Sequence, residues 1–560
     1  MAGRMHRGER FLLVLALFTI TEFVSAGARA RAGEASDIEA LRARVEAIRT
    51  GVSNVELGET IAATTLLPAF YESRNFRRAW SDGSRAEALL RAIRDSERDG
   101  LDPSDYHRDA LEAAAKSKPE DELGLDLIRT DALIRLGYHI LFGKVDPASF
   151  DPDWNYERVI QGFDAVRELE DLLAAPDLAA RLEREKPSHP IYVGLRAALA
   201  RYRALRDAGG WPRVPAGAPL KPGAADVRVR VLRARLAATE DLPSTEVEAP
   251  ADSEAYDESL AAAVRRFQAR HGLNEDGVVG ARTLEELNVP VAKRIDQLRV
   301  NLERGRWLLR DIGRTFLAVN VAGYRLVYVK DGAIAWETKV QVGKPYRATP
   351  VFRSEISYLV LNPTWTVPPG ILRNDIIPEQ RRDGGTLERK GLRVFDRSGQ
   401  EVSPSAVDWS ARSFPYTVRQ DPGPTNALGR VKFMFPNEHN VYLHDTPSRN
   451  LFESDDRAFS SGCIRVEDPL KLAELLLAGQ SDWNRQTIDR VVAAGETRTV
   501  TIKPRVPVLL TYWTAWVRAS GELQFRRDIY GRDPEVSAAL NAPFRFTRRQ
   551  DPPARRRASP

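Results

Sequence analysis

The sequence predicts a multidomain α+β protein: a helical amino-terminal scaffold, a small three-helix module, and a mostly-β domain with a long capping insert. Three observations predict this architecture. The chain has 560 residues, which is too long for one hydrophobic core. Apolar residues recur at helical spacing as far as the segment 291–310, and from Thr315 the period changes to two. A stretch rich in proline and glycine, residues 212–222, separates the first helical part from the rest.

Residues 1–32 have the three-part form of a secretory signal. Three arginines precede an apolar run from Phe11 to Val24, and small residues follow it. The run is about 14 residues long, which is short for a membrane span, so we expect cleavage, with retention as an amino-terminal anchor as the alternative. We therefore expect the mature protein outside the cytoplasm, either soluble or tethered.

Residues 35–215 are predicted to form a helical scaffold domain, because apolar residues recur at one-turn spacing along them. His139 lies in one of these helices without a second histidine or carboxylate at metal-ligand spacing, so we interpret it as structural. The segment offers no catalytic group, and we expect its role to be mechanical.

Residues 226–289 are predicted to form three short helices with a glycine-rich turn, and a polar insert at 240–255 interrupts them. An amphipathic connecting helix is expected over 291–312. The apolar residues that we expect to bury in the three-helix module are Leu260, Val264, Phe267, Leu273, Val279, Leu284 and Leu287.

The mostly-β domain is expected over residues 313–500. It begins with strands at 316–321, 325–329 and 334–340, the last two joined by the hairpin turn Lys330-Asp331-Gly332. A helix is expected over 469–478. The segment 370–428 lacks a clear period and is predicted to be an irregular capping insert or lid. A β-hairpin is predicted within 501–535, from strands at 508–517 and 523–525, and a disordered, arginine-rich tail over 536–560.

The charge distribution limits the partners that we expect. Lysine and arginine number 83 and aspartate and glutamate 78, a net charge of +5 that is spread along the chain. This suits an anionic cell-wall polymer or a lipid surface, whereas no element combines a basic face with interleaved aromatics, as nucleic-acid binding would require. The histidines show no ligand spacing, so we expect no metal and no cofactor.

The chain has one cysteine, in the run Ser460-Ser461-Gly462-Cys463-Ile464-Arg465, nineteen residues after His444. A lone exported thiol cannot form an intramolecular disulfide, which favours a reactive role over that of a small buried hydrophobe. A thiol needs a base to form thiolate, and His444 can supply one from an adjacent strand. This arrangement predicts acyl transfer through a thioester.

The residues around Cys463 have predicted supporting roles. Ser461 and Gly462 allow a sharp turn, so that consecutive N–H groups ending at Cys463 can face an oxyanion, and the Ser460 hydroxyl could orient the histidine or the donor peptide. Arg465 would lie on the same face as Cys463 and could hold a substrate carboxylate or form a structural salt bridge. His439 is a rival base.

The spacing of His444 and the Ser460–Arg465 run resembles the signature of the L,D-transpeptidases of the peptidoglycan layer (YkuD-type catalytic domain), and Gly343 with Thr349-Pro350 resembles an earlier landmark of that domain. The order of the parts and residues 294–304 resemble the large YcbB-like subfamily, and residues 226–289 resemble a peptidoglycan-binding module. Ser461 stands where many smaller relatives carry a second histidine, which removes one candidate proton carrier.

The resemblance implies that Cys463 attacks the third residue of a donor tetrapeptide stem and expels D-alanine, and that an amine of a neighbouring stem resolves the thioester as a 3→3 cross-link. His444 would carry the protons, and a backbone carbonyl would hold its other nitrogen. Tyr442 and Trp365 could line the donor groove or belong to the core. Carboxypeptidase action, D-amino-acid exchange and anchoring of a protein to the wall remain alternatives for the same thioester, and a non-catalytic wall-binding scaffold is a further one.

Overall fold

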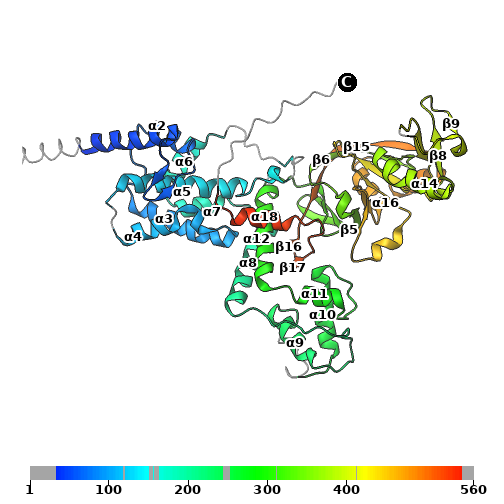
Figure 1. Cartoon of the computed structure of the whole chain (residues 1–560), viewed down its shortest axis with the longest axis horizontal. Coiled ribbons are helices and arrows are strands. Elements are labelled where there is room, and N and C mark those ends of the chain that lie inside the picture. The colour runs from blue at the N-terminus through cyan, green and yellow to red at the C-terminus, as the bar shows by residue number, and fades with distance from the viewer. Residues whose placement is uncertain are drawn as a thin grey trace, which may run out of the picture. The chain divides into compact units, whose positions relative to one another are not determined.

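The computed structural model describes residues 33–117, 120–150, 155–156, 163–243, 253–310, 312–411 and 413–544 (Figure 1). These residues divide into two compact units, one containing residues up to Val145, 163–188 and 538–544, and the other the remainder. The expected signal segment, 1–32, and most of the polar insert at 240–255 lie outside the described residues. No helix within the described ranges combines the length and the apolar character needed to cross a bilayer.

The first unit is mainly helical. Its longest helix, α5 (Glu122–Phe142), begins at Asp121, whose side chain accepts a hydrogen bond from the Gly124 N–H. Within α5, His139 is buried and its Nδ1 lies 2.8 Å from the Tyr106 hydroxyl, in agreement with a structural role. The other elements are residues 33–50, β1 (Val55–Glu56), β2 (Glu59–Thr60), α2 (Leu66–Ser73), α3 (Gly83–Asp95), α4 (Arg108–Lys116), α6 (Ala165–Ala174) and α7 (Leu178–Arg184).

In the second unit, the three-helix module consists of α9 (Arg228–Ala238), α10 (Glu258–His271) and α11 (Ala281–Leu287). Asp257 caps α10, and Gly272, in the left-handed conformation, ends it. The residues of the module's core include Val229, Leu232, Leu236, Leu260, Val264, Phe267, Val279 and Leu287. The prediction for Leu273 was wrong, because this residue is half-buried and lies outside the cluster.

Two long helices, α8 (Pro190–Asp207) and α12 (Val291–Leu308), pack on each other in the same unit. Their contact buries Arg306, which is paired with Glu303 and donates to the Tyr192 hydroxyl at 3.0 Å. The expected connecting helix therefore exists as α12. The helix α8, which the sequence grouped with the scaffold helices, is instead part of the unit that contains α12.

The β domain is built on a nine-stranded sheet in the order β13-β5-β14-β12-β11-β6-β15-β3-β4. The long strand β5 pairs with β4 through its first part and with β14 and β13 through its second, which closes the sheet on itself. Its strands are β3 (Phe316–Asn320), β4 (Arg325–Lys330), β5 (Ala333–Gly343), β6 (Arg353–Leu361), β11 (Val431–Met434), β12 (Leu443–His444), β13 (Ala458–Ser460), β14 (Ile464–Val466) and β15 (Arg498–Thr511); the helices α16 (Pro469–Leu477) and α17 (Arg485–Ala494) follow β14 in the chain.

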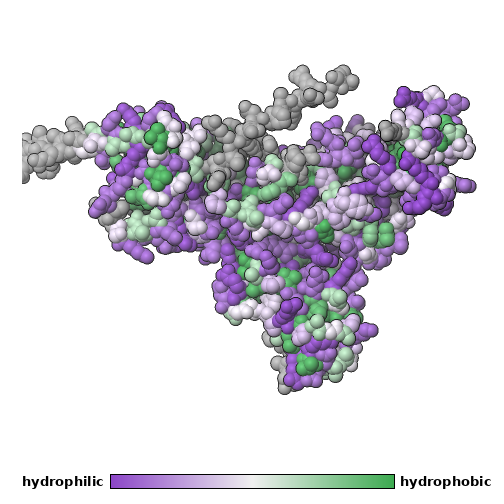
Figure 2. All heavy atoms as spheres, in the orientation of Figure 1, coloured by the Kyte–Doolittle hydropathy of each residue, from purple (hydrophilic) through white to green (hydrophobic). Residues whose placement is uncertain are grey.

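The prediction that 370–428 is irregular was wrong. This segment, together with β7 (Trp365–Thr366), forms a subdomain with a sheet in the order β7-β10-β8-β9 and its own apolar core. Its elements are α13 (Pro369–Ile371), α14 (Ile377–Asp383), α15 (Thr386–Arg389), β8 (Leu392–Phe395), β9 (Glu401–Val402) and β10 (Thr417–Gln420). Its strands are short and its exterior is strongly hydrophilic in the view of Figure 2, which explains the absence of a readable period.

The carboxyl-terminal predictions also need correction. Residues 508–511 end β15, which runs between β6 and β3, and the hairpin is limited to β16 (Ala515–Val517) and β17 (Leu523–Phe525). The predicted tail begins inside a helix, α18 (Asp533–Asn541), and the residues after 544 are not described. In α18, Val536 and Leu540 are buried, and this one-turn spacing explains why the helix forms.

Candidate active site

Cys463 and His444 lie on neighbouring strands. The strands β12 and β14 run parallel, with Leu443 opposite Ile464 and His444 opposite Arg465. Leu443 and Ile464 are fully buried in the main core. Because side chains alternate along a strand, Tyr442, His444, Cys463 and Arg465 share the opposite face of the sheet.

This register places Tyr442 beside Cys463 and His444 diagonally across from it, a relation in which Cα atoms lie about 7–8 Å apart and side chains can still meet. The Cys463 Sγ lies 3.8 Å from the Asn440 carbonyl oxygen and contacts the Tyr442 hydroxyl. The Tyr442 and His444 rings have centroids 5.7 Å apart. Among the described residues, no hydrogen bond joins the thiol to the imidazole, so direct proton transfer between them would require a side-chain movement.

His444 is held as a neutral base. Its Nδ1 lies within hydrogen-bond distance of the Asp445 carbonyl oxygen, and since a carbonyl only accepts, Nδ1 carries the proton and Nε2 is left as an acceptor. The residue is only 4% exposed. Burial, with the nearby charge of Arg465, lowers the pKa of His444 to about 3.

The carbonyl that binds His444 belongs to a firmly held residue. The Asp445 carboxylate is buried and accepts hydrogen bonds from Arg430 Nε and from Arg449, each at 2.8 Å. Gly429, with a φ of 60°, passes so close that a Cβ there would meet the Asp445 Cβ at 2.5 Å. Asp445 therefore acts on the imidazole through its main chain, while its side chain fixes that main chain in place.

The Cys463 side chain is half-buried, and burial raises the pKa of its thiol despite the opposing effects of Tyr442 and Arg465. With a raised thiol pKa and a lowered imidazole pKa, the resting pair is thiol and neutral imidazole. A pair in these forms is suited to general-base catalysis, in which the proton moves as the sulfur attacks.

The turn before Cys463 is fixed by Ser460. This buried hydroxyl donates to the Cys463 carbonyl at 2.5 Å and accepts from the Gly462 N–H at 3.1 Å. The Gly462 N–H is thus already bonded, contrary to the expectation of consecutive free N–H groups. Among the described residues the Cys463 N–H has no hydrogen-bond partner, which leaves it as the candidate oxyanion donor. Within the described ranges, no hydrogen bond joins Ser460 to His444.

The glycine and threonine of the earlier landmark support the same turn. Thr349 Oγ1 accepts from the Gly343 N–H at 2.9 Å and donates to the Gly462 carbonyl at 2.8 Å. The Tyr530 hydroxyl donates to the Gly343 carbonyl at 2.6 Å. A Cβ on Gly343 would meet the Arg347 carbonyl oxygen at 2.1 Å, so only glycine fits here.

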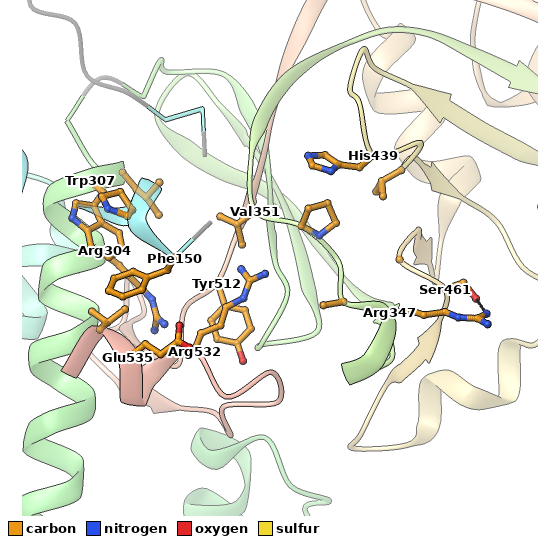
Figure 3. Close-up of a pocket in the computed structure, with 17 residues that line it drawn as sticks. Phe150, Arg304, Trp307, Arg347, Val351, His439, Ser461, Tyr512, Arg532 and Glu535 are labelled. Carbon is orange, nitrogen blue, oxygen red and sulfur yellow. Dashed lines mark hydrogen bonds between the residues drawn. The ribbon is translucent and has the colours of Figure 1, made fainter. Parts of the chain in front are cut away.

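Ser461 is exposed and connects the turn to the capping subdomain. Arg347 donates to the Ser461 hydroxyl at 2.9 Å and forms a two-pronged ion pair with Asp375 of that subdomain. Figure 3 shows Arg347 reaching Ser461 at one end of a pocket of about 620 Å³. The pocket lining includes Gly462 and His439 but neither Cys463 nor His444.

Arg465 has no carboxylate partner among the described residues, and its NH1 donates to Gln341 Oε1 at 3.2 Å. The structural salt bridge considered for Arg465 is therefore absent among the residues that the structure describes. Lys432, which sequence reasoning missed, lies on β11 directly opposite His444. Strand alternation in 431–434 places it on an outer face, but the register that brings it to His444 is not readable from the sequence.

Two other candidates lie elsewhere. Trp365 packs against the core of the capping subdomain, and no contact with Cys463 or His444 is seen among the described residues. The ring of His439 packs on Phe352, with centroids 5.0 Å apart, and lines the pocket in Figure 3. In the described ranges, no cluster of three or more histidine, cysteine or acidic side chains could hold a metal ion.

Three family models match the chain. Residues 314–499 match the model described as an L,D-transpeptidase catalytic domain (YkuD), residues 65–199 match a scaffold domain, and residues 226–287 match a "Putative peptidoglycan binding domain". A protein of Haemophilus influenzae named "Putative L,D-transpeptidase" is 38% identical over 223 residues, which is 40% of this chain and 45% of that protein. The chain thus spans less than half of this curated relative.

Two crystal structures of L,D-transpeptidases resemble the chain more distantly. That from Xylanimonas cellulosilytica is 17% identical, with 53% of this chain and 99% of the other covered and a TM-score of 0.18. That from Stackebrandtia nassauensis is 14% identical, with 52% and 94% covered and a TM-score of 0.21. With scores this low, neither likeness bears on the function of this chain.

Proposed function

We propose that this protein cross-links peptidoglycan stem peptides through a thioester on Cys463, because residues 314–499 match the model of an L,D-transpeptidase catalytic domain. The observation that carries the proposal is the register of β12 and β14, which puts the only thiol of the chain on one face with a neutral, oriented His444. The three-domain order is consistent with the large YcbB-like subfamily.

The proposed reaction begins with a donor tetrapeptide stem. The Cys463 sulfur attacks the carbonyl carbon of the third residue while His444 Nε2 takes the thiol proton. The Cys463 N–H donates to the developing oxyanion. The bond to D-alanine breaks, His444 returns the proton to the departing amine, and the acyl group remains on sulfur.

The second half-reaction uses the same groups in reverse. The side-chain amine of a diamino acid on a neighbouring stem attacks the thioester, and His444 takes its proton and returns it to the sulfur. The product is a 3→3 cross-link. We place the reaction in the periplasm, on the basis of the charged and then apolar amino-terminal sequence, and expect the 226–287 module to bind the wall.

The test is incubation of the purified protein with tetrapeptide-bearing disaccharides, followed by mass spectrometry of the protein and the products. We expect an acyl adduct on Cys463, release of D-alanine and 3→3 dimers, and Cys463→Ala should abolish all three. Dimer formation by Cys463→Ala would refute the assignment, whereas hydrolysed tripeptide without dimer would indicate that water resolves the thioester.

A matched pair of histidine variants tests the base. His444→Gln should slow acylation at least about 100-fold, in the range lost when a general base is removed. His439→Gln, which alters the histidine of the neighbouring loop, should have a small effect. A larger loss of acylation rate in His439→Gln than in His444→Gln would assign the base to His439.

A further inference from the structure

Two cationic side chains flank His444 on the active-site face. Lys432 of β11 is its register partner on one side and Arg465 of β14 on the other, and Gln341 of β5 continues the row beyond Arg465. Neighbouring strands are about 4.8 Å apart, so both cationic side chains begin within one strand spacing of His444.

Neither cation has a counter-ion among the described residues. Arg465 donates only to the neutral Gln341, and its Nε is buried without a hydrogen-bond partner. The Lys432 Nζ lies 5.9 Å from the centroid of the Tyr442 ring and forms no ion pair within the described ranges. Both are half-buried, and desolvation lowers the pKa of each.

The lack of a counter-ion distinguishes Lys432 and Arg465 from two arginines that bind Asp445, the residue after His444. Arg430 and Arg449 share the Asp445 carboxylate, although Arg430 is half-buried, as Lys432 and Arg465 are, and Arg449 is exposed. Leaving charge partly desolvated and unpaired is costly, so the face around His444 favours binding of an anion. The row is therefore suited to a carboxylate that arrives with the substrate.

The chemistry of the step indicates which carboxylate this is. His444 must deliver the thiol proton to the amine of the departing D-alanine, and one carbon atom separates that amine from the carboxylate of the same residue. When the amine lies against His444 Nε2, the carboxylate lies beside His444 as well, within the span of Lys432 and Arg465.

We propose that Lys432 and Arg465 bind the terminal carboxylate of the donor stem and thereby select donors that end one residue after the scissile carbonyl. The inference rests on the proposed function of Cys463. In the step, the sulfur–carbon bond forms, the carbon–nitrogen bond to D-alanine breaks, and the thiol proton passes through His444 to the departing amine. D-alanine leaves with the carboxylate that the two cations held.

Carboxylate binding also helps the base. The charge of Arg465 opposes protonation of His444, and a carboxylate placed beside it compensates for that charge. The imidazole then becomes a better proton acceptor only when a donor with a free terminus is bound.

The experiment compares two donor stems that differ only in the last group, D-alanine or D-alaninamide. Acylation is followed by intact mass and by release of the amine. We expect the wild type to prefer the free acid by about 10- to 100-fold in kcat/KM, the loss expected when a hydrogen bond to a charged group is removed. D-alaninamide is the less basic leaving group, so intrinsic reactivity opposes this preference.

Lys432→Met and Arg465→Gln should each reduce the preference, measured as the ratio of kcat/KM for the acid donor to kcat/KM for the amide donor. Any effect of the lost charge on His444 itself acts on both donors and cancels in this ratio. Lys330→Met, which removes an exposed strand lysine at the end of β4, should keep both the rates and the preference. Lys432→Arg, which retains the charge, should keep most of the preference and covers the case in which Lys432→Met does not fold.

Equal rates with acid and amide in the wild type would overturn the inference while leaving the thioester intact. An undiminished preference in folded Lys432→Met and Arg465→Gln would overturn the inference as well. So would an acylation rate that depends on amidation of the third residue of the stem rather than of its terminus. Failure of both donors to acylate Cys463 in the wild type would instead refute the proposed function.

Discussion

At the scale of single residues, the site depends on what burial does to two titratable groups. His444 is nearly inaccessible and lies next to an unpaired arginine, which lowers its pKa to about 3, and desolvation raises the pKa of the Cys463 thiol. Both shifts favour the uncharged forms. The resting pair is therefore an uncharged thiol and an uncharged imidazole.

Alkylation tests this resting state directly. With iodoacetamide, we expect the rate at Cys463 to be low at neutral pH and to rise continuously above pH 9, because the thiolate is the reactive form and the thiol pKa is raised. The rate is measured by intact mass as a function of pH, with free cysteine as the reference. A rate that is high and independent of pH between 5 and 8 would indicate a thiolate–imidazolium pair and contradict this account.

The lowered pKa of His444 also predicts a pH dependence of stability. An unfolded histidine titrates near 6.5, so between about pH 6.5 and 3 the unfolded chain binds more protons than the folded one. The free energy of unfolding therefore falls as the pH drops through this window, and His444→Gln should remove this part of the fall. Between pH 7 and 4.5 the wild type should lose about 2 kcal/mol more than His444→Gln in urea unfolding. Equal losses of unfolding free energy in the two proteins would show that burial does not lower the pKa of His444.

At the scale of elements, the turn before Cys463 is held by segments far away in the sequence. Gly343, the last residue of β5, donates its N–H to Thr349 Oγ1, and that hydroxyl donates to the Gly462 carbonyl. The Gly343 carbonyl accepts from the Tyr530 hydroxyl. Ser460 closes the turn from within. The position of the Cys463 side chain thus depends on the close approach of the backbone at Gly343 as well as on the residues of the turn.

Gly343→Ala tests that contact. The new methyl group would meet the Arg347 carbonyl oxygen at 2.1 Å and the Thr349 nitrogen at 2.9 Å, so the backbone must move. We expect a loss of about 1–3 kcal/mol or more in unfolding free energy and a loss of acylation by Cys463. Gly479→Ala is the control, because no atom lies within 4 Å of its added carbon. Similar melting temperatures for the two variants would contradict the packing argument.

At the scale of the second unit, the hairpin β16–β17 contacts three helices, α8, α10 and α12. Phe525 is 1% exposed and contacts Tyr202 of α8, His271 of α10 and Arg294 of α12. The main chain takes part too, because Gln297 donates to the carbonyls of Thr514 and Arg526 at 2.9 Å each. The three-helix module is thereby packed on the hairpin β16–β17 through His271 of α10 instead of being joined to the rest of the unit only by a linker.

Phe525→Ala should weaken all three contacts at once. We expect a cost of about 3–5 kcal/mol, typical of a buried phenylalanine, together with faster proteolysis within α9–α11. The control is Tyr346→Ala, an aromatic residue that is 73% exposed. Calorimetry and limited proteolysis are the measurements, and an unchanged proteolysis pattern in Phe525→Ala would show that the module holds its position without this joint.

The sequence by itself determined the local elements and the candidate pair of Cys463 and His444. Helical and alternating periods identified α10, α12 and the strands β3 to β5, because each period depends on neighbours a few residues away. The spacing of Cys463 and His444 suggested the proposed chemistry through its resemblance to a family signature. Periodicity was insufficient for the capping subdomain, whose strands are short, and for the end of β15, which read as part of a hairpin.

Only the tertiary structure decided the register of β11, β12, β14 and β5. That register aligns Lys432, His444, Arg465 and Gln341 and buries the imidazole beside an unpaired charge. Pairing between strands that are distant in the chain depends on how the whole sheet closes, and a shift of one residue would turn every side chain to the other face. The local pattern therefore specifies which groups can react, and the closed sheet specifies their neighbours and protonation states.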